Sequence, residues 1–213
     1  MIIEQYGLTL KRINEGDIEQ LRLWRNANHV RLKMPNQKLI SKVQQKEWFR
    51  KVDSEQHLFF LLSDENQSIG CLNIRDIDLE NKTGIPGVFI GNSNYLGSIV
   101  PVMAVICLLN LGFSALNLKE LSSPVLSSNK DAIKLYKELG FEIFHRQEDP
   151  RVFDTICFKE NFLAAKNKFE EVFGNLTGLQ NFSMKIIMKK SNPYYELIGS
   201  QMEENTGIQL SQS

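Results

Sequence analysis

Short alternating runs and longer helical runs of hydrophobic positions divide the first part of the chain into predicted elements. Residues 7–13 alternate apolar and polar positions, which predicts a first strand. Apolar positions recur every three or four residues across 18–26, which predicts a helix. A second helix is expected to begin at Ser41, because Ser41 and Gln44 have the spacing of a capping box.

The middle of the chain continues with strands and two further helices. An uncharged apolar run over residues 99–109 predicts a buried helix, and Gly140 is expected to end a later helix as its C-cap. The other predicted elements are strands at 57–62, 68–77, 88–90, 121–126, 141–146 and 152–158 and a helix at 130–139. This order predicts a three-layer α/β/α domain whose sheet is mostly antiparallel, with one parallel contact near its middle.

The pattern changes after residue 160. Apolar positions at 162, 165, 169 and 172 or 173 predict one more amphipathic helix, and residues 182–188 fit either a strand or a helix. Residues 191–213 carry no Lys or Arg and little periodicity, which predicts a flexible polar tail. The expected organisation is therefore a domain at 1–160, an extension at 161–190 and a tail at 191–213.

The charge balance argues against two classes of partner. Lys plus Arg and Asp plus Glu both total 25, so the formal net charge is zero and no overall field attracts nucleic acid or an anionic membrane. The apolar run over 99–109 is too short to span a bilayer, which needs about 20 residues. We therefore expect neither a nucleic-acid partner nor a membrane partner.

The cysteines and the N-terminus indicate a cytoplasmic protein. Cys71, Cys107 and Cys157 each lie in a separate apolar run, which predicts buried free thiols in a reducing compartment. No metal-ligand spacing connects them, so no metal is expected. The first residues lack the basic and apolar segments of a signal peptide, and export is not indicated.

Two stretches of the sequence resemble a known family. Residues 129–141 contain an Asn, then a helix with a Tyr, then Gly-Phe, which is similar to the late signature of the Gcn5-related N-acetyltransferase (GNAT) superfamily. The order of the predicted elements is also that of the family. The early stretch resembles the subgroup that acetylates nucleotide-linked amino sugars, notably in the pseudaminic acid pathway, through Leu23–Asn26, Val30–Arg31, Met34, Ile40–Ser41 and Trp48–Phe49. The resemblance covers roughly residues 7–160.

The resemblance implies a fold, a reaction and a donor. The sheet would splay at its centre, and acetyl-CoA would be the co-substrate of an N-acyltransferase. Tyr136 would hydrogen-bond the departing sulfur, since full proton transfer from a pKa near ~10 to one near ~8.5 is uphill. The implied donor-binding residues are Phe89, Ile90, Gly91, Gly97, Ser98, Ile99, Asn129 and Tyr136.

Each of these roles has a structural alternative. Tyr136 fits the apolar stripe of its helix, where it would only pack. Asn129 lies seven residues earlier, on the same side of the helix, but it also fits a plain N-cap. The stretch 88–91 would pair its backbone with the pantetheine arm, and it equally fits an ordinary buried strand.

The loop expected to bind pyrophosphate departs from the family's pattern. Residues 95–101 read Tyr-Leu-Gly-Ser-Ile-Val-Pro and lack the usual Arg or Gln and two later glycines. A helix N-terminus still favours an anion, but Ile99 hinders close approach and Pro101 removes one donor. Donor binding would then be weaker, would use another pantetheine carrier, or would recruit a basic residue such as Lys130, Lys134 or Lys137.

The acceptor site is expected near the first helix. Trp24, Arg25, Asn26 and Arg31 combine an aromatic face with fork-shaped donors suited to phosphate and sugar hydroxyls, which fits a nucleotide-linked amino sugar. The alternative places Trp24 in the core and the arginines on a solvated face. No general base is identifiable, and the three histidines are expected to be structural, namely His29, His57 and His145.

Two other functions remain open at this stage. A protein N-terminus or a polyamine would be the acceptor if the cleft were acidic. A degenerate family member that binds a ligand or partner without catalysis would follow from the altered loop. A homodimer is possible in either case, with the C-terminal extension as a contact or a lid.

Overall fold

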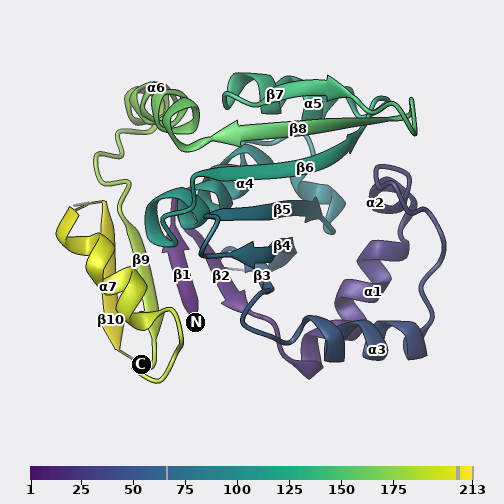
Figure 1. Ribbon diagram of the computed structural model, residues 1–213, viewed down its shortest axis with the longest axis horizontal. Coiled ribbons are helices and arrows are strands. Elements are labelled where there is room, and N and C mark those ends of the chain that lie inside the picture. The colour runs from purple at the N-terminus through teal and green to yellow at the C-terminus, as the bar shows by residue number, and fades with distance from the viewer. Residues whose placement is uncertain (66, 205–206, 213) are drawn as a thin grey trace.

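The computed structural model describes residues 1–65, 67–204 and 207–212. Ten strands form one sheet in the order β10-β9-β1-β2-β3-β4-β5-β6-β8-β7 (Figure 1). The strands are β1 (Ile2–Gln5), β2 (Leu8–Arg12), β3 (Leu58–Ser63), β4 (Ser68–Asp78), β5 (Thr83–Ile90), β6 (Glu120–Leu126), β7 (Glu142–His145), β8 (Val152–Phe158), β9 (Met184–Met188) and β10 (Ile208–Gln212).

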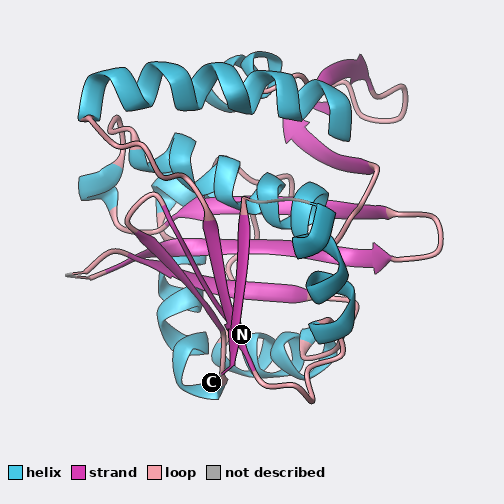
Figure 2. Ribbon diagram, turned by 90° about the vertical axis from the view of Figure 1, so that its left-hand side faces the viewer, coloured by secondary structure: helices cyan, strands magenta, loops and turns pink. Residues whose placement is uncertain are grey.

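Helices pack on both faces of this sheet (Figure 2). The α-helices are α1 (Ile18–Asn26), α2 (Asn28–Arg31), α3 (Lys42–Val52), α4 (Val100–Asn110), α5 (Lys130–Glu138), α6 (Lys159–Thr177) and α7 (Tyr195–Glu204). One face carries a small apolar cluster between α1, α3 and the strands β3 to β5. The other carries the main core, which α4 fills and to which α6 and α7 contribute. The predicted three-layer, mostly antiparallel architecture is confirmed.

The first half of the sheet follows the sequence prediction, with one correction. Ser41 caps α3 through the expected capping box, in which Ser41 Oγ accepts from the Gln44 N–H at 3.2 Å. The predicted strand at 7–13 is instead the second strand of a hairpin. Tyr6 and Gly7 both have positive φ, 55° and 75°, and this tight turn separates β2 from the short strand β1.

Helix α4 is the buried helix expected from the uncharged run. Eight of its residues, from Met103 to Asn110, are buried, and a π-helical segment, η3 (Leu111–Ala115), follows directly. Among the described residues, no helix combines the length and apolarity needed to cross a membrane. The short strand predicted at 88–90 is the end of the longer strand β5, whose first half is hidden in the sequence by Gly84, Pro86 and Gly87.

The C-terminal segment differs from the prediction of a flexible tail. Helix α7 follows Tyr194, and β10 pairs in parallel with β9, which itself pairs with β1. Tyr194, Ile198 and Ile208 are buried in the main core. Tyr194, Ile198 and the buried Gln201 have helical spacing, and the stripe is inconspicuous in the sequence because one of its members is a glutamine. Figure 1 shows this unit at the end of the sheet opposite β7.

Candidate active site

The centre of the sheet opens between two parallel strands. β5 and β6 pair only at Thr83↔Glu120 and Gly84↔Leu121, although both strands continue for several residues beyond these pairs. Figure 1 shows the two strands separating toward their C-terminal ends. We call this opening the β5–β6 gap. It is the splay that the family resemblance implies.

The backbone of β5 offers free hydrogen-bonding groups to this gap. The N–H of Gly91 donates to the carbonyl of Ile69 on the β4 side, at 2.9 Å. Because alternate residues of a strand direct their backbone groups to opposite sides, the N–H and C=O groups of Val88 and Ile90 face the gap. An extended ligand with amide groups can therefore pair with β5 as an added strand does.

The open end of the gap on the β5 side is covered by α1 and α2. The Trp24 ring lies directly on Gly91, where a Cβ atom would come within 2.1 Å of the indole. His29 Nε2 lies 3.0 Å from the carbonyl oxygen of Gly91. Trp24 thus lies on Gly91 at the end of β5, and it packs against the apolar cluster of that face, as its structural alternative expects. His29 was expected to be structural, and this contact with the Gly91 backbone agrees with that expectation.

The β6 side of the gap carries the phenol of Tyr136. Burial raises the pKa of Tyr136, and a hydrogen bond with the side chain of Ser123 on β6 partly offsets this shift. Ser123 lies beyond the last residue of β6 that pairs with β5. The Tyr136 ring also stacks on Phe141, with centroids 4.6 Å apart. Tyr136 therefore both packs in the core and places its hydroxyl at the unpaired part of β6.

Asn129 occupies the N-cap position of α5, but its side chain does not cap the helix. Its side chain makes no capping hydrogen bond at the start of α5, and its Oδ1 instead accepts from Lys33 Nζ at 3.4 Å. Lys33 also lies 3.5 Å from Asp131 Oδ2. Lys33, which follows α2, thus contacts the start of α5 on the β6 side of the gap. The side chain of Asn129 lies at this contact.

The N-terminus of α4 keeps only part of an anion-binding loop. Ser98 Oγ accepts the N–H of Val100 at 3.2 Å, the N–H of Ser98 bonds to the Tyr95 carbonyl, and Pro101 has no N–H. Within the described part of the chain, the N–H groups of Gly97 and Ile99 have no partner. These two donors and the helix dipole fit one phosphate group of a coenzyme A donor.

The two arginines predicted to bind the acceptor both hold the loop that follows α2. Arg25 Nη2 donates to the Asn36 carbonyl at 2.7 Å, and Arg31 Nη1 donates to the Gln37 carbonyl at 3.0 Å. Neither arginine forms an ion pair with any carboxylate of the described residues. Burial lowers the pKa of Arg25, and the nearby Arg31 lowers it further. The region around Arg25 and Arg31 therefore carries positive charge that no ion pair among the described residues neutralises.

The side chain of Asn26 is not free to bind the acceptor, which was its predicted role. Its Nδ2 donates to the Ile40 carbonyl, and its Oδ1 accepts the Ile40 N–H, both at 2.8 Å. Both ends of the carboxamide are therefore used to hold the loop before α3. Asn26 shapes the site, and a ligand would have to displace these two bonds to reach it.

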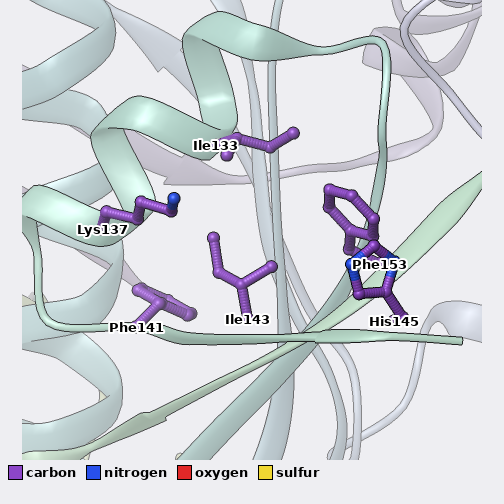
Figure 3. A pocket seen from close by; sticks show the side chains of 6 residues that line it. All are labelled: Ile133, Lys137, Phe141, Ile143, His145 and Phe153. Atoms are coloured by element: carbon purple, nitrogen blue, oxygen red, sulfur yellow. The ribbon is translucent and has the colours of Figure 1, made fainter.

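Two hollows of similar size lie away from the gap. One, of about 340 Å³, lies between α1 and α3 beside Ile18 and Gln45. The other, of about 330 Å³, lies between α5 and the β7–β8 hairpin (Figure 3) and is lined by Ile133, Lys137, Phe141, Ile143, His145 and Phe153. Lys137, considered above as a phosphate ligand, faces this hollow. Among the described residues, no cluster of three or more His, Cys, Asp or Glu side chains is arranged to hold a metal.

A sheet that opens beside a helix N-terminus, with a phenol on its far side, is an arrangement that can hold an extended thioester donor. The family model for the acetyltransferase (GNAT) domain matches residues 10–153, more than half of the chain, and the chain belongs to this family. It is therefore an acyl-CoA-dependent N-acetyltransferase. A search among curated proteins finds no match.

Solved structures share the fold at low sequence identity. Spermidine N-acetyltransferase from Vibrio cholerae, in complex with CoA and spermine, is 20% identical with a TM-score of 0.64, and the match covers 74% of this chain and 98% of that one. A domain from Methanocaldococcus jannaschii is 18% identical with a TM-score of 0.62, covering 71% and 97%. A dodecameric form of the Vibrio enzyme is 18% identical with a TM-score of 0.58, covering 74% and 96%.

Proposed function

We propose that this protein transfers an acetyl group from acetyl-CoA to a primary amine on a phosphate-bearing acceptor, with a nucleotide-linked amino sugar as the substrate class. The observation that carries the proposal is the pair Arg25 and Arg31, which lie near each other and form no ion pair with a carboxylate of the described residues. Guanidinium groups bind phosphate with directed hydrogen bonds. Trp24 supplies a flat surface suited to a sugar or a base.

The transfer is direct attack of the amine on the thioester. The donor arm lies in the β5–β6 gap along Val88 and Ile90, with its pyrophosphate at the start of α4. The amine nitrogen bonds to the carbonyl carbon, the carbon–sulfur bond breaks, and one amine proton ends on the sulfur. Tyr136 stabilises the departing sulfur by a hydrogen bond, and its raised pKa keeps the phenol protonated for this role.

A polyamine is the second candidate acceptor. It is supported by the two Vibrio structures, which are spermidine N-acetyltransferases. A polycation needs carboxylates, and Asp131 at the start of α5 is already paired with Lys33. The positive charge of Arg25 and Arg31 disfavours a polyamine beside them, and this is why the phosphate-bearing acceptor is placed first.

The experiment is a steady-state comparison of acceptors and of one variant. Acetyl-CoA is held at saturation while the amine is chosen from a nucleoside diphosphate amino sugar, the same amino sugar without its nucleotide, and spermidine. For the wild type, kcat/KM should be highest for the nucleotide-linked sugar. Arg31→Gln should raise the KM of that substrate about tenfold, since a hydrogen bond to a charged group contributes about 1.5–3 kcal/mol.

The nucleotide-free amino sugar is the internal control. Its KM should change less than twofold in Arg31→Gln, because it has no phosphate to lose a contact. An equal loss for both sugars would mean that Arg31 only supports the loop that follows α2. Faster turnover of spermidine by the wild type would replace the proposed acceptor with a polyamine.

A further inference from the structure

Asn73 is a polar residue in an otherwise apolar part of the sheet. It lies in the middle of β4, opposite Phe59 on β3 and Gly87 on β5. Phe59 and Cys71, which share its face of the sheet, both belong to the apolar cluster beneath α1 and α3. The side chain of Asn73 is therefore directed to the face on which Trp24 lies.

One end of the Asn73 carboxamide has no hydrogen-bond partner in the described part of the chain. Its Nδ2 donates to the Gly87 carbonyl at 3.2 Å. Its Oδ1 is buried and accepts no hydrogen bond within the described residues. A buried carbonyl oxygen without a donor costs free energy, and folded proteins retain few of them. The missing donor is therefore sought outside the chain.

Gly87 fixes where this oxygen lies. A Cβ atom at residue 87 would fall 2.8 Å from Asn73 Nδ2 and 2.9 Å from its Oδ1, so only glycine leaves the carboxamide room to lie flat on β5. Gly87 comes three residues after Gly84, the last residue of β5 that pairs with β6. The orphaned oxygen therefore lies near the narrow end of the β5–β6 gap.

We propose that Asn73 Oδ1 binds and orients the acceptor amine. The proposal rests on the acetyl transfer proposed above and adds the residue that positions its nucleophile. One N–H of the neutral amine donates to Oδ1, which directs the nitrogen lone pair toward the thioester carbon. That hydrogen stays on the amide product, while the second amine proton ends on the sulfur.

Asn73 Oδ1 is buried, but its neighbours on this face of β5 are only partly buried. Ile85 and Phe89 flank Gly87 on the same face of β5, and both side chains are partly exposed. A substrate that displaces one of them reaches Asn73. Its amine then supplies the hydrogen bond that no described residue provides.

The test is Asn73→Leu, which keeps the volume of the side chain and removes its polar atoms. The matched control is Asn81→Leu in the turn between β4 and β5, where Asn81 bonds to Asp78 at the surface. For each protein we would measure kcat and KM with the best amine of the acceptor panel, the Kd for acetyl-CoA by calorimetry, and the melting temperature. Asn73→Asp, which keeps an accepting oxygen, is the conservative variant.

Asn73→Leu should lose at least tenfold in kcat/KM for the amine while the donor Kd stays within twofold and the melting temperature does not fall. Asn73→Asp should retain more activity than Asn73→Leu, and Asn81→Leu should match the wild type. Unchanged turnover of Asn73→Leu, or a joint loss of melting temperature, donor binding and turnover, overturns the role of Asn73 alone. Failure of the wild type to acetylate any amine overturns this role together with the proposed function.

Discussion

Strand β5 is paired very differently on its two sides. On the β4 side, pairing runs from Thr83 to Ile90, with one irregularity near the turn. On the β6 side it ends after Gly84. One side of the strand is thus a complete antiparallel ladder, while the other leaves backbone groups without a strand partner.

This difference shows where the fold makes room for a ligand. Unpaired backbone groups inside a protein are costly, so a sheet leaves them open only where another partner can bind them. Antiparallel β4 and β5 are joined by a short turn and close along their length. Parallel β5 and β6 are joined through α4, and the start of α4 therefore lies at the open end of the gap.

The largest effect is expected at the open end, from Gly91→Ala. The new methyl group would meet the Trp24 ring at 2.1 Å, so the indole must move away from the gap. Misplacement of a binding group by about 1 Å costs about 100-fold in rate, and we expect kcat/KM for the amine to fall by about this factor. Steady-state kinetics measures it.

The control for Gly91→Ala is Gly199→Ala in α7, where the nearest atom to the added methyl is 4.0 Å away. That variant should keep wild-type activity and unfold at a slightly higher temperature, because alanine favours a helix over glycine by about 1 kcal/mol. Equal activity of Gly91→Ala and the wild type would show that the position of Trp24 is not required.

On the β4–β5 side of the sheet, the buried thiol of Cys71 should make the stability of the protein fall at alkaline pH. Burial raises the pKa of the Cys71 thiol from 9.0 to about 12. A raised pKa means that folding is favoured below pH 9 and loses this contribution as pH rises from 9 toward 12. At pH 10.5 the loss is about 2 kcal/mol, at 1.36 kcal/mol per pH unit.

Urea unfolding of the wild type and of Cys71→Ala at pH 7.5 and 10.5 measures this loss. The variant lacks the thiol, so its free energy of unfolding should fall less between the two pH values. Parallel pH profiles for the two proteins would mean that Cys71 ionises equally in the folded and unfolded states, and that the β4–β5 side is more open than described.

On the β6 side of the gap, the substitution Tyr136→Phe is expected to have a smaller effect on the rate. The ring remains to stack on Phe141, and only the hydroxyl near Ser123 is lost. Turnover should fall about tenfold, because the variant loses one hydrogen bond to the departing sulfur, which contributes about 1.4 kcal/mol. The Kd for acetyl-CoA, measured by calorimetry, should change less than twofold. Wild-type turnover in this variant would remove Tyr136 from the mechanism.

Most of the central sheet could be predicted because its local patterns agree with its tertiary structure. The alternation of β2, the apolar run of β3 and the capping box of α3 are all local signals. The first half of β5 carries Gly84, Pro86 and Gly87, which are poor strand formers, so the strand is evident only from its pairing with β4. Helix α7 was hidden for a related reason, since one of its buried positions, Gln201, is polar.

The site could be predicted only where a motif marks it. Trp24 and Tyr136 belong to the stretches that resemble the family, and the structure brings both to the gap. The contact of Trp24 with Gly91 joins residues far apart in sequence, and no local pattern encodes it. Asn73 gives no signal in the sequence, because an asparagine in a strand becomes notable only when its partners are known.

The most direct test of the account is amide hydrogen exchange along β5, with and without saturating acetyl-CoA. The account predicts that the amides of Val88 and Ile90 exchange at least about tenfold more slowly with the donor bound, because the pantetheine arm takes up their hydrogen bonds. The amides of Gly87 and Phe89, directed to β4, should change little. Unchanged exchange at Val88 and Ile90 under saturating donor would contradict donor binding in the β5–β6 gap.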